Sequence, residues 1–223
     1  HGASSVPGMI VVSDLSVRHL RDISLTVPEG AMTLVLGANG SGKSTLLSAV
    51  AGLITPQKGS VTTSSRPNLL MQESEYALFG QTPLEELLLT YPNPDERRMN
   101  RAREVLCRYG IDPESPVATL SFGQKRKLAL LTTLFPPSDV LLFDEPTAGL
   151  DWFSVKELIA TLKDFRIGRS VLIATHDVRS FLSLLKNGDS FLFLYEGKAH
   201  IYPRLDEARK AVSLHPEYGI FPF

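Results

Sequence analysis

A glycine-rich segment with one lysine and adjoining hydroxyl residues is the part of this sequence best suited to chemistry. Its residues are Gly37, Ala38, Asn39, Gly40, Ser41, Gly42, Lys43, Ser44 and Thr45. Glycines allow such a loop to fold closely around phosphate groups, towards which the backbone N–H groups point. Lys43 can reach the β- and γ-phosphates of a nucleotide, and the Ser44 hydroxyl can join the coordination shell of Mg²⁺. The segment therefore predicts binding of a nucleoside triphosphate, with an incidental glycine-rich turn as the alternative.

The residues around this loop have the order that phosphate binding requires. Residues 31–36 are apolar and predict a buried strand, and residues 45–51 predict a helix. A strand before the loop and a helix after it distinguish a phosphate-binding loop from a chance glycine-rich turn. We therefore interpret residues 37–45 as a phosphate-binding loop.

Two consecutive carboxylates, Asp144 and Glu145, end a second short apolar run, residues 140–145. Such a run suits a strand that is buried on both faces. A carboxylate at the end of a strand beside a phosphate-binding loop can hold Mg²⁺, which is the role we predict for Asp144. Glu145 is then placed to orient or deprotonate an attacking water. An acidic pair that simply meets solvent at a strand end is the alternative.

Four further motifs complete a resemblance to the ABC ATPases, the nucleotide-binding subunits of ATP-binding-cassette systems. The sequence Leu-Ser-Phe-Gly-Gln, residues 120–124, resembles the signature motif of the family, with Phe122 in place of a glycine. Asp151 stands in a segment similar to the D-loop, His176 resembles the switch histidine, and Gln72 resembles the Q-loop glutamine. All six motifs occur in the order that the family shows.

The resemblance implies a role for each motif in ATP hydrolysis. Glu145 would polarise the attacking water, His176 would hold the γ-phosphate, and Gln72 would report the occupancy of the site to a partner. Asp151 would couple two sites. The Mg²⁺ ligands implied in this way are Ser44, Gln72 and Asp144.

The resemblance also implies a head-to-tail dimer with two ATP molecules in the seam. Ser121, Gly123 and Gln124 of one subunit would then complete the nucleotide site of the other, and the second subunit could be an identical copy or a related ATPase. In the family, an aromatic residue near the N-terminus stacks on adenine. Residues 17–21 contain no Tyr, Phe or Trp, so His19 is the candidate here, with a solvent-facing histidine as the alternative.

Two segments after Gln72 narrow the resemblance to energy-coupling-factor ATPases. Residues 72–79 and 82–87 are similar to the segments that follow the Q-loop in that subfamily, and Ser-Phe-Gly-Gln resembles the signature of some of its members. The implied function is to energise an importer of a vitamin or a metal ion at the cytoplasmic face of the membrane. A groove lined by residues 72–79 would receive a helix of the integral membrane coupling subunit. Another ABC transporter or a soluble ABC ATPase are the alternatives.

The composition excludes several function classes. The chain has 223 residues, and its 23 Lys and Arg nearly balance its 24 Asp and Glu, so no basic field favours nucleic acid as a partner. The sequence contains no run of about eighteen apolar residues, so it predicts no membrane-spanning helix. The single cysteine, Cys107, cannot form an internal disulfide, which suits a reducing compartment. Residues 1–8 read as a cloning remnant ahead of Met9.

Alternating strand and helix patterns predict an α/β fold with a mostly parallel core sheet. With the resemblance, this becomes a P-loop NTPase in one domain, residues 9–223, with a small N-terminal antiparallel β subdomain and a helical lobe over about residues 73–135 that bears the signature motif. The expected strands are 9–17, 23–27, 31–36, 140–145, 170–174 and 191–195 as the last, with a short edge hairpin over 59–72. The expected helices are 45–51, 83–89, 95–109, 124–134, 152–166, 178–186 and 203–212.

Two local features leave their interpretation open. Lys125, Arg126 and Lys127 fall at the expected start of a helix, where cations are unfavourable without an anion. The γ-phosphate of a facing subunit, a buried acidic side chain or simple solvation could each account for them. Residues 218–223 are apolar, and we expect them to pack on the body of the protein or on a partner.

Overall fold

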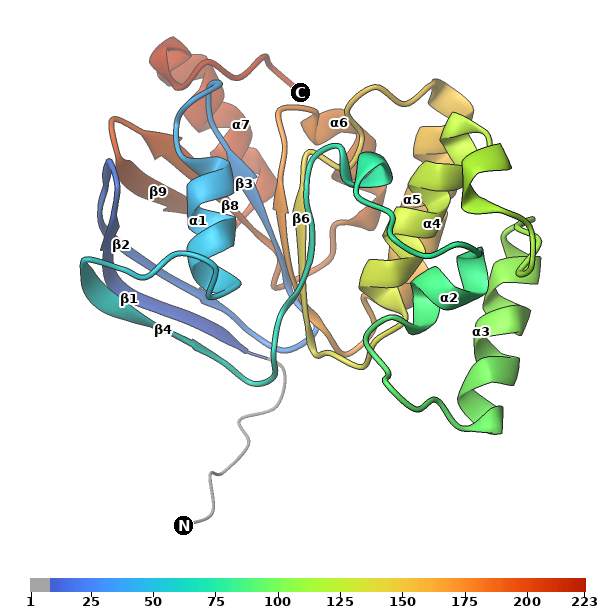
Figure 1. The fold of residues 1–223 in the computed structure, drawn as a ribbon. Helices are drawn as coiled ribbons and strands as arrows, with labels where there is room; N and C mark the ends of the chain where they lie inside the picture. Colours follow the sequence, from blue (N-terminus) through green and yellow to red (C-terminus); the bar gives the residue numbers. More distant parts are fainter. Residues whose placement is uncertain (1–8) are drawn as a thin grey trace. The chain divides into compact units, whose positions relative to one another are not determined.

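A computed structural model describes residues 9–223 (Figure 1), and the expectation for residues 1–8 lies outside them. The chain divides into two compact units. The first, which we call the core unit, consists of the chain up to Leu69 together with Ser138–Phe223. The second, the helical unit, is Leu70–Pro137.

A six-stranded sheet forms the centre of the core unit, in the order β5-β6-β7-β3-β8-β9. Neighbouring strands β6, β7, β3 and β8 run parallel, and β9 is antiparallel to β8. Every residue of β3, β6 and β7 is buried, as expected for short apolar strands covered on both faces. The prediction of a mostly parallel core sheet is confirmed. The strands are β3 (Met32–Leu36), β5 (Asn68–Leu70), β6 (Val140–Asp144), β7 (Ser170–Ala174), β8 (Ser190–Tyr195) and β9 (Lys198–Tyr202).

A smaller antiparallel sheet packs into the same hydrophobic core. It consists of β1 (Ile10–Val17), β2 (Leu20–Val27) and β4 (Lys58–Thr63), in the order β2-β1-β4. Strand β2 begins three residues earlier than expected, because Leu20 is buried and pairs with Val17 across a tight turn. The N-terminal antiparallel sheet is thereby confirmed.

The edge hairpin expected over residues 59–72 is wrong. Strand β4 pairs with β1 in the small sheet, whereas β5 lies beside β6 in the large one. Local sequence shows that both segments are extended, but the partner of each strand depends on which sheet can bury its side chains. Leu70 is buried in this arrangement, while four of the six β4 residues are exposed, as on an edge strand.

The expectation that residues 191–195 form the last strand is also wrong. After β8, Glu196 and Gly197 turn with φ angles of 47° and 75°, and β9 returns antiparallel to β8. Two residues with positive φ give the twist that a two-residue hairpin turn needs. In the sequence, the Glu196-Gly197 pair is the feature that could have indicated a hairpin turn and hence a further strand.

Within residues 9–223, the α-helices of the core unit are α1 (Lys43–Val50), α5 (Trp152–Phe165), α6 (Val178–Phe181) and α7 (Leu205–Leu214). Helix α6 is shorter than the expected helix over 178–186, since the chain tightens into a 3₁₀ turn at Leu182–Leu184. Within residues 9–223, no helix has both the length and the apolarity needed to cross a membrane.

The helical unit has its own apolar core, built from α2 (Pro83–Leu88), α3 (Glu96–Arg108) and α4 (Phe122–Leu134). Helix α4 begins two residues earlier than expected, because Ser121 caps it. The basic residues 125–127 therefore lie beyond its first turn. Arg126 forms an ion pair of 3.1 Å with the buried Glu75, so a buried acidic partner accounts for this member of the basic run.

Candidate functional site

Three segments that contain predicted site residues lie at one edge of the large sheet. The glycine-rich loop follows β3, Asp144 ends β6, and His176 lies two residues beyond the end of β7. Strands β6, β7 and β3 are neighbours and parallel, so their carboxyl ends lie together. The crevice outside these ends is where open α/β sheets bind ligands. The topology thus brings together three of the predicted motifs from distant parts of the sequence.

The glycines of the loop have conformations that other residues would not adopt. Gly37 has a φ of 151°, and a Cβ there would lie 2.5 Å from Ser41 Oγ and 2.6 Å from the Leu194 carbonyl oxygen. Gly42 has a φ of 106° and stands at the N-cap of α1 without a side chain to bond the helix N–H groups. These N–H groups are therefore available for an anion at the start of α1.

The ammonium group of Lys43 lies inside the loop, next to one of the acidic residues. It donates to the Gly37 carbonyl at 2.9 Å and to the Ala38 carbonyl at 3.3 Å, and it stands 3.7 Å from Glu145 Oε1. Lys43 is only 7% exposed. A buried cation held by carbonyl groups and one carboxylate can exchange these partners for phosphate oxygens when a nucleotide enters.

Glu145 connects the loop to the predicted switch histidine. Its Oε2 lies 2.9 Å from His176 Nδ1 and accepts the His176 backbone N–H at 3.3 Å. Glu145 has a φ of 47°, which is uncommon for a residue with a side chain. Its backbone N–H donates to the Ala174 carbonyl at 2.8 Å, so neighbouring strand β7 holds this conformation. Strained backbone conformations of this kind cluster at active sites. Here the conformation places the Glu145 carboxylate next to Lys43 and His176.

Asp144 has the properties of a metal ligand. It is 7% exposed, and within the described part of the chain its Oδ1 has no hydrogen-bond partner. Burial raises the pKa of its carboxyl group, while a hydrogen bond from the Ser44 side chain lowers it. No cluster of three or more His, Cys, Asp or Glu side chains suited to a metal ion occurs within residues 9–223. One carboxylate and one hydroxyl fit Mg²⁺, which is usually held by few protein ligands, phosphates and water.

The raised pKa of Asp144 predicts that this residue costs stability. The folded state binds the carboxyl proton more tightly than the unfolded state, so ionisation of Asp144 favours unfolding. Stability attributable to this group falls as the pH rises from the ordinary carboxyl range through the raised folded-state pKa. At neutral pH in EDTA without nucleotide, we expect Asp144→Asn to raise the melting temperature by a few degrees and to lose Mg²⁺-dependent stabilisation by ATP.

The matched control for Asp144→Asn is Asp139→Asn, an exposed aspartate just before the start of β6. Its melting temperature should stay within about one degree of the parent, as for most surface substitutions. Scanning calorimetry at several pH values measures the effect, and the gap between Asp144→Asn and the parent should narrow as the pH falls. An unchanged or lowered melting temperature of Asp144→Asn at neutral pH would contradict this account.

Two other predicted residues, His19 and Asp151, belong to the core unit. His19 is exposed in the turn between β1 and β2, and a Cβ on Gly42 would lie 2.8 Å from its Nε2. His19 therefore borders the loop, while its stacking on adenine stays a prediction. Asp151 is the N-cap of α5 and accepts from the Ser154 N–H at 2.9 Å, which lowers the pKa of its carboxyl group.

The remaining predicted residues belong to the helical unit. Ser121 and Gln124 form a capping box, in which each side chain bonds the backbone N–H of the other residue. Gly123 lies between them, and a Cβ there would meet nothing within 4 Å. Gln72 is exposed after β5. At the start of α4, Gly123 therefore has no side chain that would block access to its backbone N–H group.

One neighbour of the phosphate-binding loop was not predicted. Gly219, in the apolar segment near the end of the sequence, lies directly against Ala38. Of the two expectations for residues 218–223, packing on the body or on a partner, packing on the body is confirmed for Tyr218 and Ile220, which are 4% and 7% exposed, whereas Phe221 is 89% exposed. The apolar composition signalled packing but gave no indication of the surface that receives it.

A phosphate-binding loop after β3 and a carboxylate pair at the end of β6 define a P-loop nucleotide-hydrolysing fold. The family model described as "ABC transporter" matches residues 20–148. The chain belongs to the ABC transporter family, as an ATP-binding and ATP-hydrolysing subunit.

Several relatives point to one branch of this family. The chain is 34% identical to the energy-coupling factor transporter ATP-binding protein EcfA2 of Symbiobacterium thermophilum, over 82% of this chain and 70% of the relative. It is also 34% identical to the cobalt import ATP-binding protein CbiO of Rhodobacter capsulatus, over 73% of this chain and 65% of the relative. The chain thus spans about two thirds of these relatives.

Solved structures agree with the fold. CbiO1 of Clostridium perfringens, part of the ABC transporter complex CbiONQ, is 26% identical to this chain with a TM-score of 0.76. The match covers 93% of this chain and 95% of that one. The arrangement of strands and helices is therefore shared along nearly the whole length of both chains.

Proposed function

We propose that this chain energises a membrane importer of the energy-coupling-factor type, which takes up a vitamin or a transition-metal ion. The names of the EcfA2 and CbiO relatives support this class of transporter and substrate. The proposal of ATP hydrolysis rests on the contact of Glu145 with both Lys43 and His176 at the edge of the sheet. Reconstitution with a membrane protein that co-purifies with the chain, followed by ATP-dependent uptake of radiolabelled substrate, tests the proposal. Failure to co-purify with any membrane protein would contradict it.

In the proposed reaction, the core unit binds ATP and prepares a water molecule for attack. Lys43 and the N–H groups at the start of α1 hold the phosphates, and His176 contacts the γ-phosphate. Glu145 accepts a proton from the attacking water or orients it. Ser44, Asp144 and Gln72 would hold Mg²⁺, which neutralises phosphate charge when it is bound.

A second ATPase subunit completes each site in this proposal. The start of α4, with Ser121, Gly123 and Gln124, would face the γ-phosphate bound to the other subunit in a head-to-tail dimer. The open space in front of Gly123 in the first turn of α4 and the positive end of the α4 dipole support this role. Asp151 would couple the two sites across the seam. The partner would be a second copy or a related ATPase, and nucleic acid is not part of the proposal.

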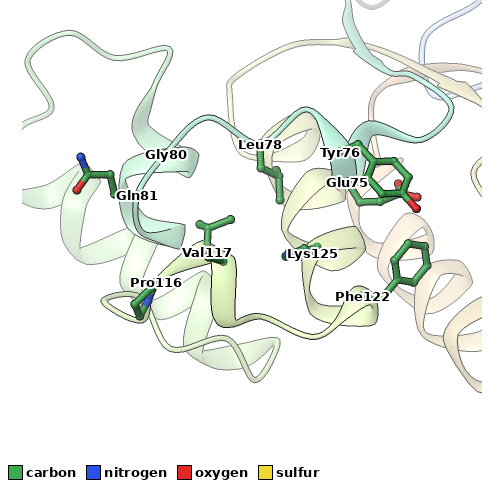
Figure 2. A pocket seen from close by; sticks show the side chains of 10 residues that line it. Glu75, Tyr76, Leu78, Gly80, Gln81, Pro116, Val117, Phe122 and Lys125 are labelled. Atoms are coloured by element: carbon green, nitrogen blue, oxygen red, sulfur yellow. The ribbon is translucent and has the colours of Figure 1, made fainter.

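A pocket on the helical unit supports docking of the membrane coupling subunit. It has a volume of about 530 Å³ and lies wholly within the helical unit. Figure 2 shows Leu78 and Val117 pointing towards each other across it, with Tyr76 and Phe122 at one end. The rings of Tyr76 and Phe122 lie 6.3 Å apart, and Tyr76 is 76% exposed. The residues that line it are Glu75, Tyr76, Leu78, Gly80, Gln81, Pro116, Val117, Ala118, Phe122 and Lys125.

Such a pocket suits an apolar helix from a membrane subunit, since exposed aromatic side chains rarely gather on a surface without a partner. Next to the pocket, Phe79 is 82% exposed. The site is formed by segments before α2 and at the start of α4, the same helix whose first turn holds the signature motif. We propose that docking here places the chain at the cytoplasmic face of the membrane as a peripheral subunit.

Substitution of the exposed aromatic residues tests the docking site. We expect the double variant Tyr76→Ser with Phe79→Ser to lower co-purification with the membrane subunit at least about tenfold, because aromatic anchors dominate interface energies. Basal ATP hydrolysis by the isolated chain should stay within about twofold, as for surface substitutions away from a site. Leu78 is left intact because it packs on the core of the helical unit.

The control for this double variant is Leu89→Ser, at an apolar side chain of the same unit that is 55% exposed and does not line the pocket. Quantitative pull-down from detergent and liposome transport assays measure assembly. Equal assembly of the control and the double variant would refute docking at this pocket.

A further inference from the structure

Residues 216–223, which we call the closing segment, fold over the carboxyl edge of the large sheet. After α7, the chain forms a 3₁₀ turn at Pro216–Tyr218, and Gly219 then has a φ of 67°. In Figure 1 this segment, in red, crosses the same end of the core unit as the loop that joins β3 to α1. The family motifs do not include it.

The closing segment lies against the phosphate-binding loop at Gly219. A Cβ on Gly219 would lie 2.8 Å from Ala38 Cβ, 3.5 Å from Ala38 Cα and 3.8 Å from Ala38 N. The Ala38 carbonyl accepts from Lys43 Nζ at 3.3 Å and from the Ser41 N–H at 3.1 Å. The backbone of Gly219 thus supports the residue that holds the phosphate-binding ammonium group.

Tyr218 anchors the segment immediately before this contact. Its ring lies 5.2 Å from that of Phe193 and 5.1 Å from that of His215, and its hydroxyl lies 3.3 Å from that of Tyr202. Burial raises the pKa of Tyr218, in keeping with a hydroxyl group held away from solvent. Next to Phe193 on β8, Leu194 provides the carbonyl oxygen that stands close to Gly37. The anchor and the loop therefore rest on the same strand.

The far end of the closing segment is tied to two helices. The Pro222 carbonyl accepts from the Arg179 guanidinium at 2.9 Å, and the Phe223 carbonyl accepts from Arg209 Nε at 2.8 Å. Arg179 belongs to α6, whose N-cap Asp177 directly follows His176. One short segment therefore joins the phosphate-binding loop to the helix that follows the switch histidine.

We propose that the closing segment positions the phosphate-binding loop for ATP, with Gly219 supporting Ala38 and Arg179 linking the segment to the His176 region. A glycine-rich loop must be ordered before its N–H groups can converge on a phosphate, and packing behind it lowers that cost. Gly219 is the residue suited to this contact, since any side chain would press on Ala38. The proposal depends on ATP binding at the loop and is independent of the membrane partner.

Gly219→Ala tests the proposal against a matched control, Gly168→Ala. Gly168 has a φ of 70°, close to the 67° of Gly219, but a Cβ there would meet nothing within 4 Å. Both substitutions place a side chain at nearly the same positive φ, whereas only Gly219→Ala presses on the loop. We expect Gly219→Ala to raise the KM for ATP and the Kd of a fluorescent ATP analogue about tenfold, with kcat changed less than twofold. Gly168→Ala should leave both constants unchanged.

A double-substitution cycle separates positioning from general destabilisation. Ala38→Gly removes the methyl group that Gly219→Ala would meet, so we expect Gly219→Ala to cost less than about twofold in affinity in the Ala38→Gly background. Equal losses in both backgrounds, or equal ATP affinity in Gly219→Ala and Gly168→Ala, would overturn the proposal. Should Gly219→Ala not fold, Arg179→Ala removes an exposed tether instead, and an unchanged KM for ATP would then refute the link to the segment.

Discussion

Replacing Lys43 with alanine is expected to abolish ATP binding, with a loss of affinity of at least about a hundredfold. Lys43 is the only cationic side chain in residues 37–45, and its ammonium group is already buried among the Gly37 and Ala38 carbonyls beside Glu145. Without it, phosphate oxygens would meet the Glu145 carboxylate with no intervening cation. Isothermal titration with ATP, with and without Mg²⁺, measures the loss.

Lys58→Ala provides the control for Lys43→Ala. Lys58 lies on β4 in an exposed ion pair of 2.8 Å with Asp22, and such surface pairs contribute little. Its affinity for ATP should equal that of the parent. Thermal unfolding without nucleotide shows whether Lys43→Ala retains the fold, because a collapsed protein would also lose binding. Near-normal ATP affinity in folded Lys43→Ala protein would remove the basis for the phosphate-binding loop.

Glu145→Gln is expected to separate ATP binding from ATP hydrolysis. The amide keeps the size and hydrogen-bonding capacity of the side chain but cannot accept a proton, so hydrolysis should fall by about 10²–10⁴-fold. Affinity for ATP should be retained, since Lys43 and the start of α1 are unchanged. If the second subunit completes the site, the bound nucleotide should also hold two subunits together, and a dimer should accumulate with MgATP.

A second glutamate with the same backbone conformation serves as the control for Glu145→Gln. Glu196, in the turn between β8 and β9, also has a φ of 47° but is exposed. Glu196→Gln should hydrolyse ATP at the parental rate and should not form a stable dimer with MgATP. Multi-angle light scattering and phosphate release report the two properties. If Glu145→Gln stays monomeric with saturating MgATP, alone and with a related ATPase, a site completed by a second subunit is ruled out.

Glu145 and Asp144 are adjacent, but the fold gives them different environments. Glu145 has a partner near each carboxylate oxygen, the Lys43 ammonium group near one and the His176 imidazole near the other. Asp144 has a buried Oδ1 without a hydrogen-bond partner in the described residues, together with a raised pKa. The environment of Glu145 suits a group that acts on water beside the γ-phosphate. The environment of Asp144 suits a group that binds a cation. Side chains from the same strand end thus receive distinct roles from their neighbours.

The residues of the phosphate site could be predicted from short stretches of sequence. The positive φ angles of the loop glycines, the apolar runs of β3 and β6 and the acidic pair after β6 are properties of short segments. Local patterns of this kind reflect steric limits on φ and the period of burial along a strand, which act over a few residues. For the same reason, the sequence indicated the parallel sheet and the helical lobe well, with errors of a few residues at helix ends.

Contacts between distant segments could not be predicted in this way and became apparent in the folded chain. Strands β4 and β5 separated into two sheets, and Glu75 became the partner of Arg126. Gly219 came to rest on Ala38, about 180 residues away along the chain. Each of these outcomes depends on burying a surface that another part of the chain provides, and a local pattern contains no information about that surface. The residues of the catalytic site can therefore be predicted from the sequence, whereas the contact of Gly219 with the phosphate-binding loop can be recognised only in the folded chain.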